Sequence, residues 1–210
     1  MVDIINLLLL FIGAVLFVRL TCWVSKRLVM LIKLKRLVKE HNGELKLLRF
    51  PLLPNSICSQ KPDISVRILD TVYLIRLYSG GSKYSLVHFA SDRFSVRYVK
   101  MASKWATLGG GRGRFAIVDA AQAFSAGAKV YVMPPMTVPF EFDREGLKTE
   151  KVILFNPAPN AVSYVTPEKT NIKLAFTGDE FNGMKVFTGS SFVAYADRQT
   201  RKDDKMQYFG

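Results

Sequence analysis

The first 24 residues of the chain are almost entirely apolar. Residues 4–24 form an unbroken run whose only charged side chain is Arg19. A helix rises about 1.5 Å per residue, so this run spans roughly 30 Å, the thickness of the hydrocarbon core of a bilayer. The long side chain of Arg19 can reach the headgroups, and Trp23 stands where an interfacial aromatic residue is expected. The pattern predicts a single transmembrane helix within residues 1–25.

Two other interpretations of this run are weaker. A cleaved signal peptide begins with basic residues and has a short apolar core, whereas this run is long and follows Met1-Val2-Asp3. A core helix of a soluble protein rarely stays apolar on every face. We therefore expect an uncleaved membrane anchor.

Residues 26–42 have the periodicity of a basic amphipathic helix. Apolar residues recur at steps of three and four, and charged residues occupy another face. The apolar positions are Leu28, Leu31, Leu34 and Val38, with Met30, Leu37 and His41 beside them, and the charged ones are Lys26, Lys33, Arg36 and Glu40. Asn42-Gly43 is a good helix stop. This connecting helix could sense a lipid surface, bind a partner helix or pack on the following domain, and we favour packing on the domain.

The distribution of charge predicts the orientation of the anchor. Only Asp3 is charged before the run. The basic residues in its last turns and from there to the first following acid, Glu40, are Arg19, Lys26, Arg27, Lys33, Lys35, Arg36 and Lys39. The positive-inside rule places this side in the cytoplasm. We expect a single-pass protein of the cell membrane with a cytoplasmic C-terminal domain.

From residue 43 the pattern changes to short alternating runs that predict strands. The predicted strands are 44–50, 64–69, 72–78, 84–89, 93–99, 129–133, 151–155, 161–165, 172–176 and 184–187. Turn residues at 70–71 and 80–83 predict an antiparallel meander over residues 64–89. Helices are predicted at 118–125 and from Ser190 or Ser191 to Arg198. The fold class is α+β, with a mixed, mostly antiparallel sheet in a soluble domain over 43–198 and a polar, frayed tail at 199–210.

Composition excludes several classes of protein and of site. The chain has 210 residues, enough for a proper core, and its two cysteines, Cys22 and Cys58, exclude a disulfide scaffold. The two histidines, His41 and His88, do not stand at metal-ligand spacing, and the sequence contains no nucleotide-binding or hydrolase fingerprint. We predict no cofactor, no metal and no small-molecule substrate, and the sequence favours a protein without catalytic activity.

Two segments could bind an anion. Residues 107–114 are glycine-rich and could cradle a phosphate, but they match no nucleotide fingerprint, so we favour a connecting loop. The net charge is +13, and residues 93–114 contain no acid. Their basic side chains, candidate contacts for an anion or a nucleic acid, are Arg93, Arg97, Lys100, Lys104, Arg112 and Arg114. Together with Phe94, Tyr98 and Trp105 they suit single-stranded nucleic acid, a membrane surface or a solvated strand face.

The order of one helix and three strands, with Pro62-Asp63 before the second strand, resembles the start of the restriction-endonuclease-like core, the PD-(D/E)xK family. In that family an acid-x-Lys on the third strand completes a divalent-metal site that activates water. Here the corresponding tripeptide is Leu74-Ile75-Arg76. Leucine cannot bind Mg²⁺, so the resemblance implies a domain that kept the fold and lost hydrolysis, with degenerate positions Asp63, Leu74 and Arg76.

These observations predict a membrane-anchored, non-catalytic cytoplasmic module that binds a partner protein or an anionic lipid surface. The alternative is a membrane-tethered nucleic-acid-binding domain with an inactivated nuclease-like fold. An enzyme would require Asp63 to converge with other carboxylates, such as Asp70, Asp92 or Asp119, in one pocket.

Overall fold

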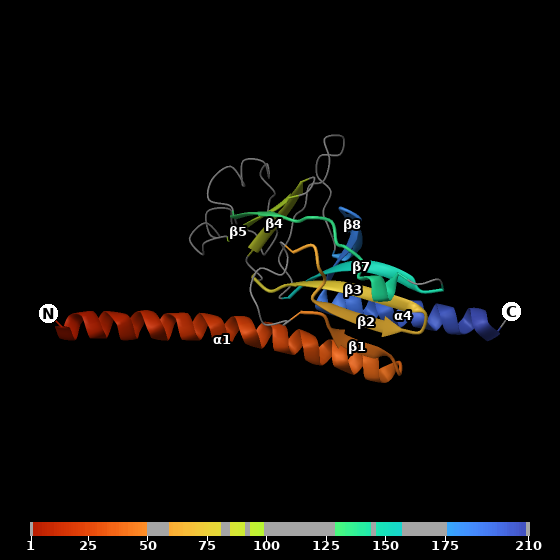
Figure 1. Cartoon of the computed structure of the whole chain (residues 1–210), viewed down its shortest axis with the longest axis horizontal. Helices are drawn as coiled ribbons and strands as arrows, with labels where there is room; N and C mark the ends of the chain where they lie inside the picture. Colours follow the sequence, from red (N-terminus) through yellow and green to blue (C-terminus); the bar gives the residue numbers. More distant parts are fainter. Residues whose placement is uncertain are drawn as a thin grey trace, which may run out of the picture.

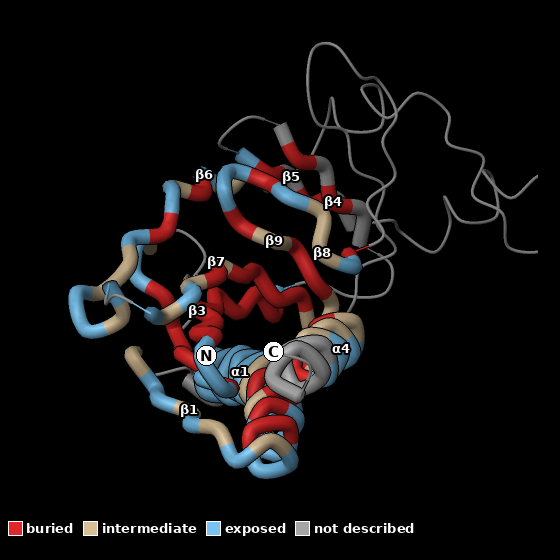
Figure 2. The backbone as a smooth tube through the Cα atoms, turned by 90° about the vertical axis from the view of Figure 1, so that its right-hand side faces the viewer, coloured by how far each residue is buried: buried red, intermediate tan, exposed pale blue. Residues whose placement is uncertain are grey.

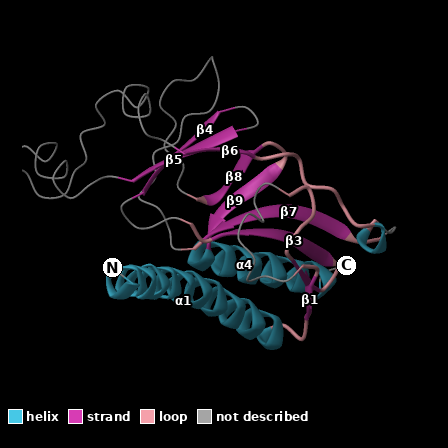
Figure 3. Ribbon diagram, turned by 60° about the vertical axis from the view of Figure 1, so that its left-hand side comes forward, coloured by secondary structure: helices cyan, strands magenta, loops and turns pink. Residues whose placement is uncertain are grey.

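The fold was obtained as a computed structural model, which describes residues 2–49, 59–80, 85–90, 93–98, 129–143, 146–156 and 176–208. The described part has three layers: two helices, a six-stranded sheet and a three-stranded sheet (Figures 1 and 3). The helices are α1 (Val2–Glu40) and α4 (Gly189–Tyr208). The large sheet has the order β1 (Glu44–Leu47), β2 (Ile64–Ile68), β3 (Thr71–Tyr78), β7 (Lys148–Phe155), β9 (Met184–Thr188) and β8 (Thr177–Phe181). The small sheet has β4 (Ser85–Ala90), β5 (Arg93–Tyr98) and β6 (Lys129–Val132), and a 3-10 turn, η2 (Phe140–Phe142), precedes β7.

Helix α1 is continuous over 39 residues and has two different halves. Its N-terminal half projects beyond the domain, and no part of its most apolar stretch is buried (Figures 1 and 2). Among the described elements it is the one helix long and apolar enough to cross a membrane. Its C-terminal half lies on the large sheet beside α4 (Figure 3). The single helix α1 is thus both a candidate membrane anchor and part of the folded domain.

The end of α1 follows the predicted stop signal. Asn42 adopts a left-handed conformation with φ 49°. The Gly43 N–H then donates a 2.8 Å hydrogen bond to the Val38 carbonyl oxygen, which closes the last turn. A Cβ on Gly43 would lie 2.2 Å from the Arg67 carbonyl oxygen, so only glycine lets β1 approach β2 here.

Strand pairing confirms the α+β class and the mixed, mostly antiparallel sheet. The pairs β1–β2, β2–β3 and β8–β9 are antiparallel, as are both pairs of the small sheet. The central pairs β3–β7 and β7–β9 are parallel. The predicted hairpin of β2 and β3 is present, with Ile64 opposite Ile75.

Two apolar clusters hold the layers together. One lies between the large sheet and the helices and includes Met30, Leu34 and Leu37 of α1 with Ile75 and Phe192. The other joins the large sheet to the small one, and its aromatic rings pack edge to face, as Phe89 and Phe155 do with centroids 5.9 Å apart. Helix packing on the domain, the favoured interpretation of residues 26–42, is what the structure shows.

The predicted meander over residues 64–89 is wrong beyond β3. Every residue of β3 is buried, as expected for a central strand that pairs on both sides. Its partners are β2 and β7, which leaves no edge for β4. Strand β4 instead pairs with β5 in the small sheet.

Several boundaries also differ from the prediction. Leu28 was placed on the buried face of the connecting helix, but half of its surface is exposed, because the buried stripe follows Arg27, Met30, Leu34 and Val38 instead. Helix α4 continues past Arg198 to Tyr208, with Thr200 buried. Strand β8, which was not predicted, begins at Thr177, and β7 begins at Lys148. The elements predicted at 118–125 and 161–165, and all of 172–176 except Phe176, lie outside the described residues.

Candidate functional site

Arg27 is buried where α1 meets the carboxyl end of β3. Its Nη2 donates a 2.9 Å hydrogen bond to the Leu77 carbonyl oxygen, and its Cζ lies 4.3 Å from the ring centroid of Trp23. Burial lowers the pKa of Arg27 to about 10, and the negative charge of Asp63 opposes that shift. The guanidinium therefore stays charged at neutral pH and ties α1 to the sheet.

Asp63 joins three segments at the start of β2. Its Oδ2 accepts a 2.9 Å hydrogen bond from the Leu77 N–H, and its own N–H donates to the Ile75 carbonyl oxygen at 2.8 Å. Its carbonyl oxygen accepts from the N–H groups of Leu48 and Arg49 at 2.9 and 3.1 Å. Only 1% of the residue is exposed, so this carboxylate acts on the backbone around it.

The two other positions that the resemblance singled out, Leu74 and Arg76, lie on β3. Leu74 is fully buried in the cluster between the two sheets. Arg76, also fully buried, donates from Nη1 to the Pro134 carbonyl oxygen at 2.6 Å and from Nη2 to that of Pro135 at 3.3 Å. Its guanidinium thereby holds the segment after β6 on the large sheet. Within the described ranges, no group of three His, Cys, Asp or Glu side chains could hold a metal ion.

The predicted anion-binding stretch is described only in part. Arg93 and Arg97 lie on β5, and Arg93 is exposed. Lys100, Lys104, Arg112 and Arg114, like the glycine-rich run at 107–114, lie outside the described residues. Of the acids considered for an enzyme, Asp70 is exposed at the turn between β2 and β3, and Asp92 and Asp119 fall outside the described part.

The structure also assembles a polar cluster that sequence reasoning missed. Glu150 of β7 accepts a 2.9 Å contact at Oε2 from the Lys185 Nζ of β9, and Lys148 Nζ lies 3.0 Å from its Oε1. Lys185 Nζ also donates to the Tyr195 hydroxyl of α4 at 2.6 Å, and that hydroxyl donates to Glu150 Oε2 at 2.9 Å. The cluster fastens α4 to two strands of the sheet.

No local signal in the sequence brings these residues together. Glu150 and Lys185 are 35 positions apart and meet only because β7 and β9 pair in parallel. The one available hint was the acid at position 150, two residues before the apolar run of β7. A parallel pairing over this distance cannot be read from periodicity.

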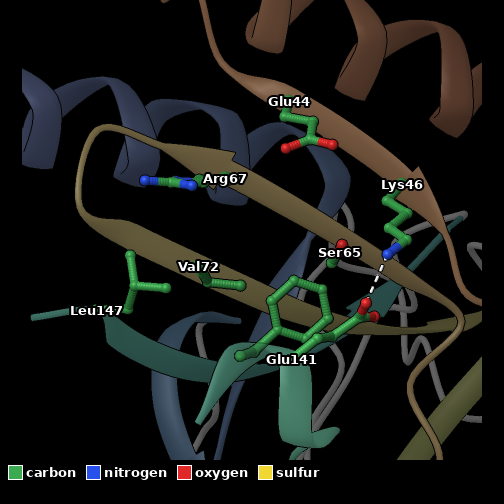
Figure 4. Close-up of a pocket in the computed structure, with 8 residues that line it drawn as sticks. Glu44, Lys46, Ser65, Arg67, Val72, Glu141 and Leu147 are labelled. Atoms are coloured by element: carbon green, nitrogen blue, oxygen red, sulfur yellow. Dashed lines mark hydrogen bonds and ion pairs between the residues drawn. The ribbon is translucent and has the colours of Figure 1, made fainter. Parts of the chain in front are cut away.

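A shallow cleft lies on the face of β1, β2 and β3 near η2 (Figure 4). Its rim carries Glu44, Lys46, Arg67 and Glu141, and Lys46 Nζ lies 2.6 Å from Glu141 Oε2. Val72, Phe142 and Leu147 contribute apolar lining. Its volume of 170 Å³ is below the range of about 300–1,000 Å³ that is typical of small-molecule sites. The opposed charges on its rim already satisfy one another in part.

Comparisons with protein-family models, with curated proteins and with solved structures find no match to this chain.

The stability of the Glu150 cluster is expected to depend on pH at both ends of the range. Burial alone would raise the pKa of Glu150, but hydrogen bonds from Lys185, Lys148 and Tyr195 outweigh it and lower that pKa. Its contribution is present above the ordinary glutamate pKa and is lost as pH falls through the lowered value. Burial alone would lower the pKa of Lys185, but Tyr195 and Glu150 raise it overall. The lysine's contribution is present below its ordinary pKa and is lost as pH rises through the raised value.

Glu150→Gln should lower the free energy of unfolding by about 1–3 kcal/mol at pH 7, because it removes charge-assisted hydrogen bonds. The loss should shrink in acid, where the wild-type carboxylate is protonated. Chemical denaturation of the full-length protein in mild detergent, from acid to alkaline pH, measures both effects. Glu44→Gln, at an exposed position on β1 at the far edge of the sheet, is the control. A Glu150→Gln profile parallel to that of the wild type would contradict a coupled cluster.

Proposed function

We propose that this chain is a single-pass, membrane-anchored and non-catalytic module whose domain stands on the cytoplasmic side and binds a partner protein or an anionic lipid surface. The observation that carries the proposal is the construction of α1. Its bare apolar half is long enough to cross a bilayer, while its other half is built into the core of the domain. A domain attached in this way is held at a fixed position next to the membrane.

The same helix argues against removal of the apolar segment as a signal peptide. Cleavage just after residue 24 would cut α1 immediately before Arg27 and Met30, both buried in the domain. Signal peptides are instead followed by a small-residue cleavage site.

The proposed orientation rests on charge. The exposed side chains of Lys33, Lys35, Arg36 and Lys39 follow the apolar half of α1, and only Asp3 precedes it. Segments rich in Lys and Arg next to a membrane span stay in the cytoplasm. These residues therefore favour a cytoplasmic domain.

The proposed lack of catalysis rests on the nuclease-like positions. Asp63 is engaged by the backbone of Leu77, and Leu74 supplies an apolar side chain where hydrolysis would need an acid. The alternative, a tethered nucleic-acid-binding domain, is supported by the exposed Arg93 of β5 and the net charge of +13.

Fractionation tests the anchor and the orientation. The full-length protein should stay in the membrane pellet after alkaline carbonate extraction and should be released by detergent. Protease added to intact cells should leave the domain uncut, and protease added to opened cells should digest it. Recovery in the aqueous fraction, or digestion in intact cells, would overturn the corresponding part of the proposal.

A binding assay separates the two proposed roles. The detergent-solubilised full-length protein should not retain single-stranded DNA or RNA at moderate salt. Retention that weakens steeply with salt, and that is reduced by Arg93→Ala with Arg97→Ala but not by Arg198→Ala, would favour the nucleic-acid alternative. Arg198 is a suitable control because it is exposed on α4, away from β5.

A further inference from the structure

Helix α1 has a domain face, which is turned toward the sheet, and an outer face on the opposite side. Along the helix, polar residues begin earlier on the domain face than on the outer face. The domain face carries Arg19, Trp23 and Arg27 at four-residue spacing, so these three lie one above another. The outer face points away from the sheet. It carries Thr21, Ser25, Leu28, Val29 and Ile32, and all five are exposed.

The outer face carries no charge as far as Ile32, whereas the domain face already carries a charge at Arg19. Leu28, Val29 and Ile32 are 50%, 48% and 56% exposed, and nothing in the described domain covers them. The hydroxyls of Thr21 and Ser25 donate to the carbonyl oxygens of Phe17 and Cys22 in their own helix, at 2.8 and 2.9 Å. The polar groups of this face are thus already satisfied, as a lipid environment requires.

The length of the outer apolar run implies a tilted helix. Residues 4–32 measure about 43 Å along the helix axis, against about 30 Å of hydrocarbon. A stretch longer than the bilayer core is accommodated by tilting, here by more than the average of about 20°. Trp23 and the domain fix the direction of the tilt. Trp23 lies on the domain face and anchors at the interface, and the polar domain that Arg27 ties to the same face stays out of the hydrocarbon. The outer face therefore leans toward the lipid and the domain leans away from it.

The positive charge of the outer face indicates that its ligand is an anionic lipid. Within residues 26–39 of α1 there is no acid, and four exposed cations follow directly on the apolar patch: Lys33, Lys35, Arg36 and Lys39. A parallel second copy packed on this face would bring Lys35 and Lys39 close to their own equivalents, which is unfavourable. Anionic headgroups complement both the charge and its position next to a span.

We propose that α1 leaves the bilayer obliquely, with Leu28, Val29 and Ile32 in the headgroup layer and Lys33, Lys35, Arg36 and Lys39 bound to anionic phospholipids. This inference rests on the proposed membrane anchor and selects the lipid surface as the ligand of the outer face. The domain then sits on the far side of α1 from the membrane.

The test uses the full-length protein, with Cys22 and Cys58 replaced by serine, reconstituted into vesicles. A spin label is placed at Ile32→Cys or, as a control on the exposed face of β8, at Glu180→Cys. The vesicles contain phosphatidylcholine alone or phosphatidylcholine with phosphatidylserine. Relaxation by a water-soluble nickel chelate and by oxygen reports whether each label lies in water or in lipid.

The label at position 32 should be shielded from nickel and exposed to oxygen, most strongly with phosphatidylserine, while the label at 180 stays in water. The double variant with Lys35→Gln and Lys39→Gln should bind the lipid surface more weakly. The ratio of label 32 shielded from nickel to label 32 exposed to nickel should fall by about fivefold for each charge removed, at low salt. Lys129→Gln with Arg198→Gln, which removes the same charge from the domain surface, should leave it unchanged.

Each other outcome overturns the inference and identifies what failed. If the vesicles carry the protein but label 32 is as open to nickel as label 180, the anchor stands and the tilt is wrong. If shielding of label 32 depends neither on phosphatidylserine nor on Lys35 and Lys39, anionic phospholipids are not the ligand of this face. Spin–spin broadening that disappears on dilution in lipid shows that a second copy covers the face. Protein that does not float with vesicles contradicts the proposed anchor as well.

Discussion

Replacing Asp63 with alanine is expected to lower the free energy of unfolding by about 3–5 kcal/mol, because the change removes one partner of a buried charged pair. Arg27, 2% exposed, would keep its charge without the nearby carboxylate that favours it. The Leu77 N–H would lose its acceptor at the same time. Denaturation of the full-length protein in mild detergent measures the loss.

Two further variants separate charge from hydrogen bonding. Asp63→Asn keeps an oxygen that can accept from the Leu77 N–H, so it should cost less than Asp63→Ala. Asp70→Ala, at an exposed turn between the same strands, should change stability by less than about 0.5 kcal/mol. An Asp63→Ala protein as stable as the wild type would show that the carboxylate does not hold the junction of α1, β2 and β3.

Leu34→Ala is expected to cost about 2–5 kcal/mol, because it opens a cavity in the cluster between α1 and the sheet. Leu28→Ala makes the same chemical change six residues earlier in the same helix, on the exposed outer face, and should cost less than about 0.5 kcal/mol. Denaturation of the two full-length variants in the same detergent gives the comparison. Equal losses would mean that α1 does not present the face described here to the domain.

The features that the sequence predicted correctly depend on local pattern. The long apolar helix follows from an unbroken run. The hairpin of β2 and β3 follows from alternation with a turn, predicted at residues 70–71 and found at 69–70. The stop at Asn42-Gly43 follows from the conformational preferences of those two residues.

The features that it missed depend on contacts between distant segments. Strand β3 pairs with the distant strand β7, which leaves no edge for β4 and ends the predicted meander at β3. The polar sequence of β8 gives no strand signal, and this strand depends on its pairing with β9. The register of the buried face of α1 was shifted because Leu28 and Met30 are equally apolar, and only the position of the sheet selects Met30.

In the candidate site, too, some features could be predicted from the local sequence and others depend on contacts between distant segments. Asp63 could be singled out from the sequence, yet its bond to Leu77 and its closeness to Arg27 come from the fold. The cluster of Glu150, Lys185 and Tyr195 joins two strands and a helix, so no spacing along the chain could have indicated it.

Hydrogen–deuterium exchange on the full-length protein in lipid nanodiscs tests most directly whether α1 is at once anchor and core. We predict unbroken protection of the α1 amides from the apolar segment through Val38, with residues 27–38 opening only when the whole domain unfolds. Rapid exchange at residues 24–27, which would mark a flexible joint between the membrane segment and the domain, would contradict the account.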